Sequence, residues 1–558
     1  MTDRPPLAVG VDLGTTNSAV ACLDDLGRPQ TLINAEGDKV TPSVVLFEGT
    51  DVVVGKEALK AVATDADQVA QCTKRELGSR MFHKVLGGRQ YPPQTIEAWV
   101  LNKLRSDASR QIGPFEQVVI TVPAYFDEVR RKATQDAGYM AGFEVLDIIN
   151  EPTAAAVAFG FKQGFLSTDG QVRQAQRILV YDLGGGTFDV TVMEIEGTQF
   201  TALATDGDVH LGGHDWDYRL VDFVAEEFIR KFRIDPREEP NTLGRLWREC
   251  EDAKRTLSAR SKASIACDYQ GQAVRIEVTR NKYEELTKDL LDRTAFTTRQ
   301  TLQAAGLEWS DLSHVLMVGG STRMPMVANM LRDLSGMEPN CSVSADEAVA
   351  HGAALRCGIL LSQSAGKRPK FSIRNVNSHS LGVVATDSKT KRKRTAILIP
   401  RNTALPITAK RIFKTQKADQ KSILVQIVEG ESASPDDCTQ IGRCSVRPLP
   451  RNLPAQTPIE VRFSYREDGR LTVLVMVAKT DVTLRHEITR ENSLTQDQLD
   501  SWREYISGVP KRTRRDEPAG ADASAGTSAQ VVQGQPASPG TTPTPADGEE
   551  RSGKQRWT

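Results

Sequence analysis

The sequence lacks paired cysteines, long apolar runs and an excess of either charge. Its eight cysteines are scattered without a C-x-x-C pair, which excludes a zinc site of the usual spacing and a disulfide framework. No apolar run approaches the roughly 20 residues that span a bilayer, so we expect no membrane segment. The 71 Lys and Arg balance 72 Asp and Glu, and no whole-chain charge points to nucleic acid or membranes. Because the cysteines are scattered, we expect them to be reduced thiols. A strand-turn pattern follows the first Met closely, so we expect no leader sequence and a cytoplasmic location.

The order of patterns divides the chain into five segments. Residues 1–362 alternate β-branched runs with helical patterns, which predicts α/β architecture. Small, basic and proline residues at 363–372 predict a linker. Short alternating strands at 373–492 predict a β-sandwich. A short helix is expected over 493–508, whereas 509–558 holds too few large apolar residues to offset chain entropy and is expected to be disordered.

Two stretches have similar sequences: VGVDLGTTNSA at 9–19 and VYDLGGGTFDV at 180–190. Each joins a strand that ends in Asp to a Gly-rich turn. Such turns present backbone N–H groups to anions, and the carboxylate can hold a Mg²⁺-bound water. One copy would also suit a plain β-hairpin, but two copies predict turns that close on one nucleotide from opposite sides. The residues concerned are Asp12, Gly14, Thr15, Thr16, Asn17, Asp182, Gly184, Gly185, Gly186, Thr187 and Asp189.

A third stretch, ECEDAKRTLSA at 249–259, predicts a helix with a polar face. Four polar residues fall at positions i, i+3, i+4 and i+7, which a helix places on one side. They are Glu251, Lys254, Arg255 and Ser258. By itself this pattern fits an exposed, salt-bridged helix as well as a ligand-binding face.

Further motifs occur in an order that resembles one family. They are ITVPAYFDEVRRKATQDAG (120–138), IINEPTAAAVAFG (148–160), GDVHLGGHDWD (207–217), VLMVGGSTRMP (315–325) and DEAVAHGAAL (346–355). Together with the two turns and the 249–259 helix, they resemble the seventy-kilodalton heat-shock chaperone family. The resemblance implies an actin-like ATPase domain of two lobes followed by a peptide-binding β-sandwich. The implied function is an ATP-dependent chaperone for unfolded or extended polypeptides, active in protein folding and the stress response.

The resemblance also assigns catalytic roles. Lys74, in CTKRELG, matches the lysine that reaches the γ-phosphate, and Glu151 matches the carboxylate that orients the attacking water. Asp182 and Thr187 complete the catalytic set. By residue type alone, Lys74 would be a solvated surface lysine, and Glu151 a first-turn helix residue stabilised by the helix dipole.

The implied cofactors are ATP or ADP and Mg²⁺, with K⁺ as a further candidate. Asp12, Asp182 and Asp189 match carboxylates near the metal ion. The polar face of the 249–259 helix matches residues that hold adenine and ribose, with Arg255 stacked on the base. The other lobe would complete the pocket with Gly319, Gly320, Ser321, Arg323 and Asp346.

The β-sandwich would bind extended peptide through backbone hydrogen bonds and a small apolar pocket. By resemblance, the pocket includes Val383, Phe413, Ile423 and Val425. The alternation of apolar residues does not show which face of a strand would line a groove, so these residues also fit the ordinary core of a sandwich.

Some features depart from the family pattern. The stretch GKRPKFSIRNVNS at 366–378 is basic and polar where the family has a short apolar linker, so we expect weaker coupling between nucleotide state and peptide affinity. Asp147 occupies a position where the family usually has an Arg that contacts J-domain partners, which disfavours an ordinary J-domain co-chaperone. A nucleotide exchange factor is a further candidate partner. The residues after 493 are too few for a full helical lid, so clients should exchange quickly.

Other functions would fit single features of the sequence. The basic loop KTKRKR at 389–394 invites a nucleic-acid or acidic-partner hypothesis, but a solvated loop is the preferred interpretation. A regulatory or scaffold protein that binds nucleotide and one dedicated partner is the alternative function. A sugar kinase would share the two turns but not the NEPTAAA and GGSTRMP motifs or the β-sandwich.

Overall fold

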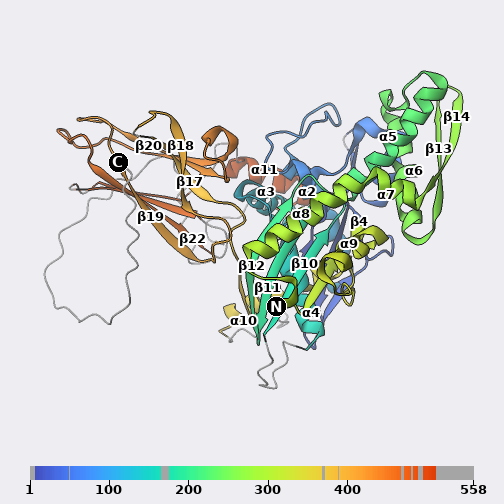
Figure 1. Cartoon of the computed structure of the whole chain (residues 1–558), viewed down its shortest axis with the longest axis horizontal. Coiled ribbons are helices and arrows are strands. Elements are labelled where there is room, and N and C mark those ends of the chain that lie inside the picture. The colour runs from blue at the N-terminus through green and yellow to red at the C-terminus, as the bar shows by residue number, and fades with distance from the viewer. Residues whose placement is uncertain are drawn as a thin grey trace. The chain divides into compact units, whose positions relative to one another are not determined.

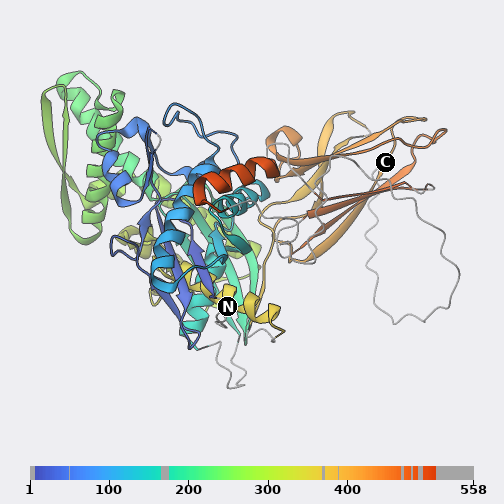
Figure 2. The same cartoon turned by 180° about the vertical axis from the view of Figure 1, so that it is seen from behind.

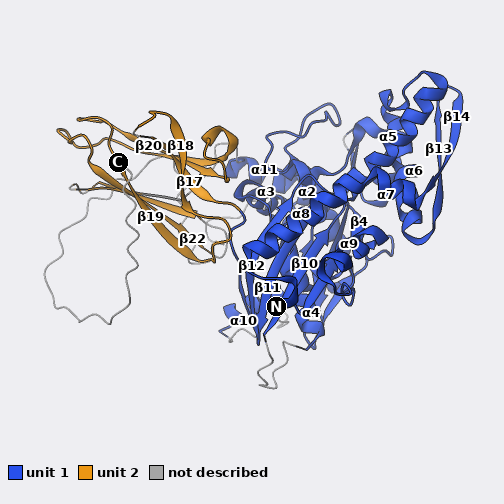
Figure 3. Ribbon diagram, viewed as in Figure 1, with its two compact units in different colours: residues 1–378, 492–521 blue, residues 379–491, 522–558 orange. Residues whose placement is uncertain are grey.

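The computed structural model describes residues 7–49, 51–164, 175–366, 371–387, 389–466, 471–478, 480, 482–487 and 494–509 (Figure 1). They belong to two compact units (Figure 3). The first unit contains Met1–Ser378 and Asn492–Ala521, and the second contains His379–Glu491 and Asp522–Thr558. The chain therefore leaves the first unit, builds the second and returns. The expected tail, 509–558, lies outside the described residues apart from Val509.

The first unit is built on two sheets that share one local plan. Their strand orders are β3-β2-β1-β8-β9, with β4 beside β2, and β15-β10-β11-β12-β16. In each sheet an antiparallel hairpin, β1–β2 or β10–β11, has a later strand, β8 or β15, parallel to its first strand. This repetition places the two similar sequence turns at equivalent positions, and it confirms the predicted α/β class. The bounds are β1 (Val9–Asp12), β2 (Asn17–Leu23), β3 (Pro29–Leu32), β4 (Thr41–Pro42), β8 (Gln117–Val122), β9 (Glu144–Asn150), β10 (Gln176–Leu183), β11 (Phe188–Glu196), β12 (Gln199–Asp208), β15 (His314–Val318) and β16 (Ser372–Arg374).

A pair of helices joins the two sheets. α10 (Ala348–Ser364) packs on β1, β2 and β8 of the first sheet, while α4 (Glu151–Lys162) packs on β10 and β11 of the second, and the two helices contact each other. Small residues make this close packing feasible, since a Cβ added at Gly352 would collide with the backbone of Ala154. Because helices cover the strands, β1 and β10 read as nearly continuous apolar runs.

The remaining elements of the first unit cover the sheets and build an extension around α5, α6 and the β13–β14 hairpin. α2 and α3 pack against each other, and α8 lies against β11 and β12. The bounds are α1 (Lys56–Ala61), α2 (Pro93–Ile112), α3 (Glu128–Met140), α5 (Gly213–Phe232), α6 (Pro240–Ala259), α7 (Arg280–Leu286), α8 (Lys288–Ala304), α9 (Pro325–Ser335), β5 (Val45–Glu48), β6 (Asp51–Val54), β7 (Val69–Ala70), β13 (Lys262–Tyr269) and β14 (Gln272–Thr279). The 3₁₀ turns are η1 (Ala66–Gln68), η2 (Thr73–Glu76), η3 (Pro236–Glu238), η4 (Trp309–Asp311), η5 (Gly320–Arg323) and, in the second unit, η6 (Pro435–Asp437).

The helix expected over 493–508 is α11 (Gln496–Ser507), and it packs on α2 and α3 of the first unit (Figure 2). Thr495 caps it in a capping box with Gln498. Leu499 and Ile506 are buried in the hydrophobic cluster that α2 and α3 share.

Arg503 fastens α11 to the end of α3. Its side chain is buried, and its guanidinium donates to the carbonyl oxygens of Tyr139 at 2.6 Å and Gly142 at 3.1 Å. Those carbonyls belong to the C-terminal end of α3, where a cation is favourable. The guanidinium also lies 4.6 Å from the centre of the Tyr139 ring.

The expected linker contains ordered structure at both ends. α10 continues to Ser364, and Ser372 already belongs to β16, which pairs in parallel with β12. Residues 367–370 lie outside the described residues. Residues 372–374 therefore add a strand to the second sheet, while Phe371 is buried in the adjoining hydrophobic cluster and Ile373 packs against it.

The second unit is a sandwich of two four-stranded antiparallel sheets, as the alternating pattern predicts. The sheet orders are β18-β17-β20-β21 and β19-β22-β23-β24. In β20, buried Ile423, Val425 and Ile427 alternate with exposed Leu424. The bounds are β17 (Leu381–Thr386), β18 (Lys393–Ile399), β19 (Ile407–Lys414), β20 (Ile423–Glu429), β21 (Thr439–Val446), β22 (Pro458–Tyr465), β23 (Leu471–Val477) and β24 (Thr483–Glu487).

Candidate nucleotide site

The two glycine-rich turns contact each other. The first follows β1 and the second follows β10. A Cβ added at Gly185 would collide with the side chain of Thr16, and one added at Gly186 would collide with Thr15. The structure thus brings together two turns that lie about half a domain apart in sequence, and glycine is needed in the second turn because the first lies against it.

Hydrogen bonds fix the backbone of both turns. In the first, the Ser18 hydroxyl accepts from the Gly14 N–H at 3.1 Å, and the Ser43 hydroxyl donates to the Gly14 carbonyl at 2.8 Å. In the second, the Gly184 N–H donates to the Thr187 carbonyl at 3.0 Å, while the Ser321 hydroxyl donates to the Gly184 carbonyl at 2.8 Å. Turns held in this way are preorganised for an anion.

Lys74 is buried between the first turn and the start of α4. Only 1% of its side chain is exposed, which excludes a solvated surface lysine. Its Nζ donates to Glu151 Oε1 at 2.5 Å and to the carbonyl oxygen of Leu13. The predicted catalytic lysine and carboxylate therefore form a direct ion pair beside the turns.

Two buried aspartates, Asp182 and Asp189, and the half-buried Asp12 lie near this pair. Burial, followed by the charge of Glu151, raises the pKa of Asp12 to about 7 and that of Asp189 to about 8. The same two effects raise the pKa of Asp182, to which Asp189 and Asp12 also contribute. The nearby Lys74 lowers all three pKa values but does not offset the burial. The site therefore carries buried acidic groups in excess of cations.

This excess of carboxylates suits a divalent cation. Thr121 Oγ1 donates to Asp12 at 3.1 Å, and the Tyr125 N–H donates to Asp189 at 2.9 Å, so both side chains are fixed. Within the described ranges, no three His, Cys, Asp or Glu side chains gather closely enough to ligate a metal ion directly. These oriented carboxylates are groups that could help to hold a divalent cation through its bound waters.

The polar face of α6 lies against the start of α5, which in turn bonds the second turn. Lys254 Nζ donates to the Gly213 carbonyl at 3.0 Å and to Asp217 at 2.8 Å. Arg255 donates to buried Glu251 at 2.6 Å, while 61% of the Arg255 side chain stays exposed. Ser258 donates only to the Lys254 carbonyl, at 3.2 Å. The face is therefore more than an exposed salt-bridged surface, because Lys254 ties it to the start of α5.

The predicted residues after β15 also reach the second turn. Gly319 has φ of 84°, and a Cβ there would lie 2.6 Å from Asp182 Oδ1. Ser321 bonds Gly184 as described above. Arg323 and Asp346 form an ion pair with 3.2 Å between Arg323 Nη1 and Asp346 Oδ1.

The sequence patterns did not identify two further residues of this region, Arg75 and Glu97. Arg75 donates from Nε to the Gly186 carbonyl at 2.7 Å and pairs with Asp215, which accepts from the Gly212 N–H at 2.8 Å. Its place next to Lys74 in CTKRELG was the available signal. Glu97, in α2, is buried, and burial raises its pKa to about 8. Its sequence surroundings carry no comparable signal.

The four predicted peptide-binding residues lie within the sandwich. Val383, Ile423 and Val425 are at most 8% exposed, on strands of one sheet. Phe413 is half-buried on β19 of the other sheet. Burial of this kind fits a core and a groove floor equally.

Asp147 does not present a free carboxylate. It lies on β9, where its Oδ2 accepts from Arg356 Nε of α10 at 2.8 Å, and its side chain is 14% exposed. The predicted repulsion of a partner carboxylate is therefore reduced by an internal cation.

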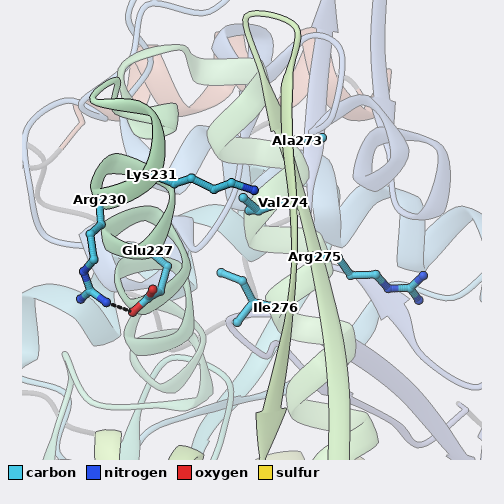
Figure 4. Close-up of a pocket in the computed structure, with 7 residues that line it drawn as sticks. All are labelled: Glu227, Arg230, Lys231, Ala273, Val274, Arg275 and Ile276. Atoms are coloured by element: carbon cyan, nitrogen blue, oxygen red, sulfur yellow. Dashed lines mark hydrogen bonds and ion pairs between the residues drawn. The ribbon is translucent and has the colours of Figure 1, made fainter.

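A cavity of about 610 Å³ lies elsewhere in the first unit, between α5 and β14 (Figure 4). Lys231 and Ile276 line it, and Arg230 and Glu227 form an ion pair at its edge. None of the predicted nucleotide residues contributes to its lining.

Comparison with known proteins identifies the family. The sequence model of the Hsp70 protein family matches residues 8–88 and 80–531. This chain belongs to the Hsp70 family. The Hsp70 match spans both units, so it covers the nucleotide site and the sandwich together.

Individual relatives support the same family assignment. The chaperone protein DnaK of Metamycoplasma hominis is 38% identical over 503 residues, which cover 88% of this chain and 81% of the relative. The DnaK of Halobacterium salinarum is 39% identical over 473 residues, 83% of this chain and 72% of the relative. The DnaK of Thermotoga neapolitana is 36% identical over 515 residues, 88% of this chain and 83% of the relative.

This Hsp70 is accordingly an ATP-dependent chaperone and an ATPase, which binds ATP and ADP and acts on unfolded polypeptides. The comparisons favour this function over the regulatory or scaffold alternative. Among the described residues, no helix combines the length and the apolarity required to cross a bilayer.

Proposed function

We propose that Mg-ATP binds between the two turns, with its phosphates held by N–H groups and hydroxyls of Thr15, Thr16 and Gly184 to Thr187. The observation that carries this proposal is the contact between Gly185 and Gly186 of one turn and Thr15 and Thr16 of the other. Phosphoryl transfer asks the protein mainly for positioning and charge stabilisation, which fixed turns supply.

Lys74 and Glu151 would act on the attacking water. Glu151 accepts a hydrogen bond from Lys74, so the carboxylate is held in one orientation beside the first turn. It can accept a proton from a water and align that water, while the Lys74 ammonium stabilises negative charge on the γ-phosphate. Asp12, Asp182 and Asp189 would hold Mg²⁺ through its waters, and the bound ion would neutralise the phosphate charge. K⁺ is a further candidate counter-ion.

Strand β16 is a candidate route from the nucleotide to the sandwich. It pairs with β12, whose end leads through Gly212 to the start of α5. There the Gly213 N–H donates to the Gly184 carbonyl at 3.0 Å, and the His214 N–H donates to the Gly185 carbonyl at 2.7 Å. A change in the second turn would therefore shift the strand on which β16 is seated. We infer that the basic stretch retains this coupling through its backbone, in spite of its unusual side chains.

The sandwich would bind extended polypeptide segments at the pocket of Val383, Phe413, Ile423 and Val425. A J-domain co-chaperone and a nucleotide exchange factor remain proposed partners. Since Asp147 is paired with Arg356, a J-domain would meet a neutralised site. All eight cysteines are free thiols, which supports a reducing compartment such as the cytoplasm.

Two measurements on the full chain test this function together. The first is single-turnover ATP hydrolysis with and without Mg²⁺. The second is the affinity of a panel of unrelated apolar peptides in ATP and in ADP. We expect Mg-dependent hydrolysis, and broad peptide binding that ATP weakens. Peptide affinity that is absent, or equal in both nucleotides, would contradict the proposed coupling and favour a dedicated scaffold.

A further inference from the structure

Glu97 is a buried carboxyl group that has no role in the function proposed above. It lies in the second turn of α2 and is 1% exposed. Its Oε2 is fully buried and makes no hydrogen bond with any residue that the structure describes. A buried oxygen without a partner destabilises a fold, so native proteins contain few such groups and each calls for an explanation.

Glu97 lies within electrostatic reach of Lys74. α2 packs against η2, the 3₁₀ turn that carries Lys74, and also against α3, α11, β2, β5 and β6. Besides burial, the charge of Lys74 is the one influence from the described charged groups of these elements that shifts the pKa of Glu97. The interaction is mutual. Burial lowers the pKa of Lys74, whereas Glu151, Asp12 and, to a smaller extent, Glu97 raise it.

Lys74 has one hydrogen-bond donor to spare. Its ammonium group carries three N–H donors, of which one bonds the Leu13 carbonyl oxygen and another bonds Glu151 Oε1. Within the described ranges, no residue accepts a hydrogen bond from the third, and the centre of the Phe126 ring lies 5.8 Å from Nζ. An unused donor and an unused acceptor therefore lie on two elements that pack together.

One buried lysine cannot balance two buried carboxylates. Lys74 already pairs with Glu151 at 2.5 Å, so an ionised Glu97 would be an excess negative charge. Burial raises the pKa of Glu97 to about 8, and Lys74 lowers it without offsetting the effect of burial. At pH 7 Glu97 is therefore mainly a neutral carboxylic acid, whereas at pH 9 it is mainly an anion that attracts the same ammonium group as Glu151.

We propose that Glu97 is a positioning residue for ATP hydrolysis, which competes with Glu151 and the γ-phosphate for the ammonium group of Lys74. In its neutral form, Glu97 leaves Lys74 beside Glu151 and free to act on the γ-phosphate. In its ionised form, Glu97 draws the ammonium group toward α2 and slows hydrolysis. This inference rests on the proposed function, since it modulates the role given there to Lys74.

The test is the pH dependence of single-turnover ATP hydrolysis, measured on the full chain in excess over Mg-ATP. Glu97→Gln keeps the shape and an acceptor oxygen but cannot ionise. If the neutral form of a group with a pKa of about 8 is required, the active fraction falls about tenfold between pH 7 and pH 9. We expect the ratio of the Glu97→Gln rate to the wild-type rate to rise by about that factor over this range.

The other titrating groups of the site do not produce the same effect. The pKa of Lys74 is raised from 10.5, so Lys74 keeps its charge at pH 9. Asp12 and Asp189 have pKa values of about 7 and 8, and the pKa of Asp182 is raised as well. These three aspartates are present in both proteins, so the ratio of the two rates at each pH removes their contribution.

Two further variants assign the effect to Glu97. Asp107→Asn is the matched control, because Asp107 is a buried carboxylate of the same helix that pairs with Lys103 at 2.7 Å. It should keep the wild-type decline in rate between pH 7 and pH 9. Glu97→Leu removes the ionisable group with little change in volume, and it should lose the decline as Glu97→Gln does. Thermal unfolding of each variant checks that the fold is kept.

The outcomes separate this inference from the proposed function. If the ratio of the Glu97→Gln rate to the wild-type rate is equal at pH 7 and pH 9, Glu97 does not compete for Lys74 and the inference is refuted. The proposed function then stands, provided that Lys74→Met stops hydrolysis. If Lys74→Met hydrolyses ATP like the wild type, the proposed function itself fails. A rise in the ratio that Glu97→Leu shares and Asp107→Asn lacks supports the inference.

Discussion

Replacing Lys74 with Met should stop ATP hydrolysis while nucleotide binding persists. Lys74 is the cation that lowers the pKa of Asp12, Asp182 and Asp189, and it holds Glu151 at 2.5 Å. Methionine fills similar space but removes the charge and both hydrogen bonds. The loss falls mainly on the transition state, in which the Lys74 ammonium would stabilise negative charge on the oxygens of the transferred phosphoryl group.

The expected magnitude follows from the contacts of Lys74. Removal of one charged donor aimed at developing negative charge typically costs about 10²- to 10³-fold in rate, or roughly 3–4 kcal/mol. Loss of one partner of a buried ion pair also destabilises the fold, by about 3–5 kcal/mol when the other charge persists. The affinity for ADP should change little because the turns keep their own hydrogen bonds.

The assay is single-turnover hydrolysis of ATP, with ADP affinity measured separately by calorimetry. Lys84→Met is the matched control. Lys84 is half-buried, and among the described residues it donates only to the carbonyl oxygens of Ala66 and Val69, at 2.9 and 3.0 Å. Lys84→Met should hydrolyse ATP at nearly the wild-type rate. Hydrolysis by Lys74→Met within tenfold of the wild type would refute the role given to Lys74.

Three further predictions concern the residues after Gly508, α11 and the aspartates of the site. Truncation after Gly508 should leave ATP hydrolysis and the thermal transition unchanged. Arg503→Ala should lower the unfolding free energy by about 2–4 kcal/mol, because the hydrogen bonds from the guanidinium to carbonyl oxygens at the end of α3 are lost. Equal melting temperatures for the wild type and Arg503→Ala would contradict this. Without a bound cation, Asp12 and Asp189 have pKa values of about 7 and 8 in the folded protein, against 3.8 in the unfolded chain. Their protonated forms therefore stabilise the fold fully below about pH 4, and this contribution to the unfolding free energy is lost as the pH rises toward 8. Binding of Mg-ADP should therefore release protons near pH 7 and none above about pH 9, as measured by calorimetry in buffers of different ionisation enthalpy; proton uptake at pH 7 would be inconsistent with this.

Local patterns of the sequence predicted much of the fold. The strand-turn repeat indicated both sheets. Whether a segment forms an apolar strand or a Gly-rich turn depends mainly on residues that are neighbours in the sequence, so these elements can be predicted from local patterns. The period of 3.6 residues placed Glu251, Lys254 and Arg255 together on α6, and the structure shows that face with Lys254 directed to α5. Alternation in β20 and β22 indicated the sandwich.

Contacts between distant segments could not be predicted in this way. An amphipathic helix at 496–507 can be recognised from its apolar spacing, but nothing in that spacing says that it packs on α2 and α3. The strand at 372–374 was not predicted because it is only 3 residues long and its partner, β12, is distant in the sequence. Arg75 was overlooked since its partners, Gly186 and Asp215, are more than 100 residues away.

The central claim is that Asp12 and Asp182 act on one magnesium nucleotide held between two touching turns. A double-mutant cycle with Asp12→Asn, Asp182→Asn and the double variant tests it most directly, with calorimetry of ADP in the presence and absence of Mg²⁺. Because both carboxylates would contact the hydration shell of the same ion, we expect strongly non-additive losses of Mg-dependent affinity, with a coupling of at least about 1 kcal/mol. Losses that add within about 0.3 kcal/mol would show two independent sites and contradict the account.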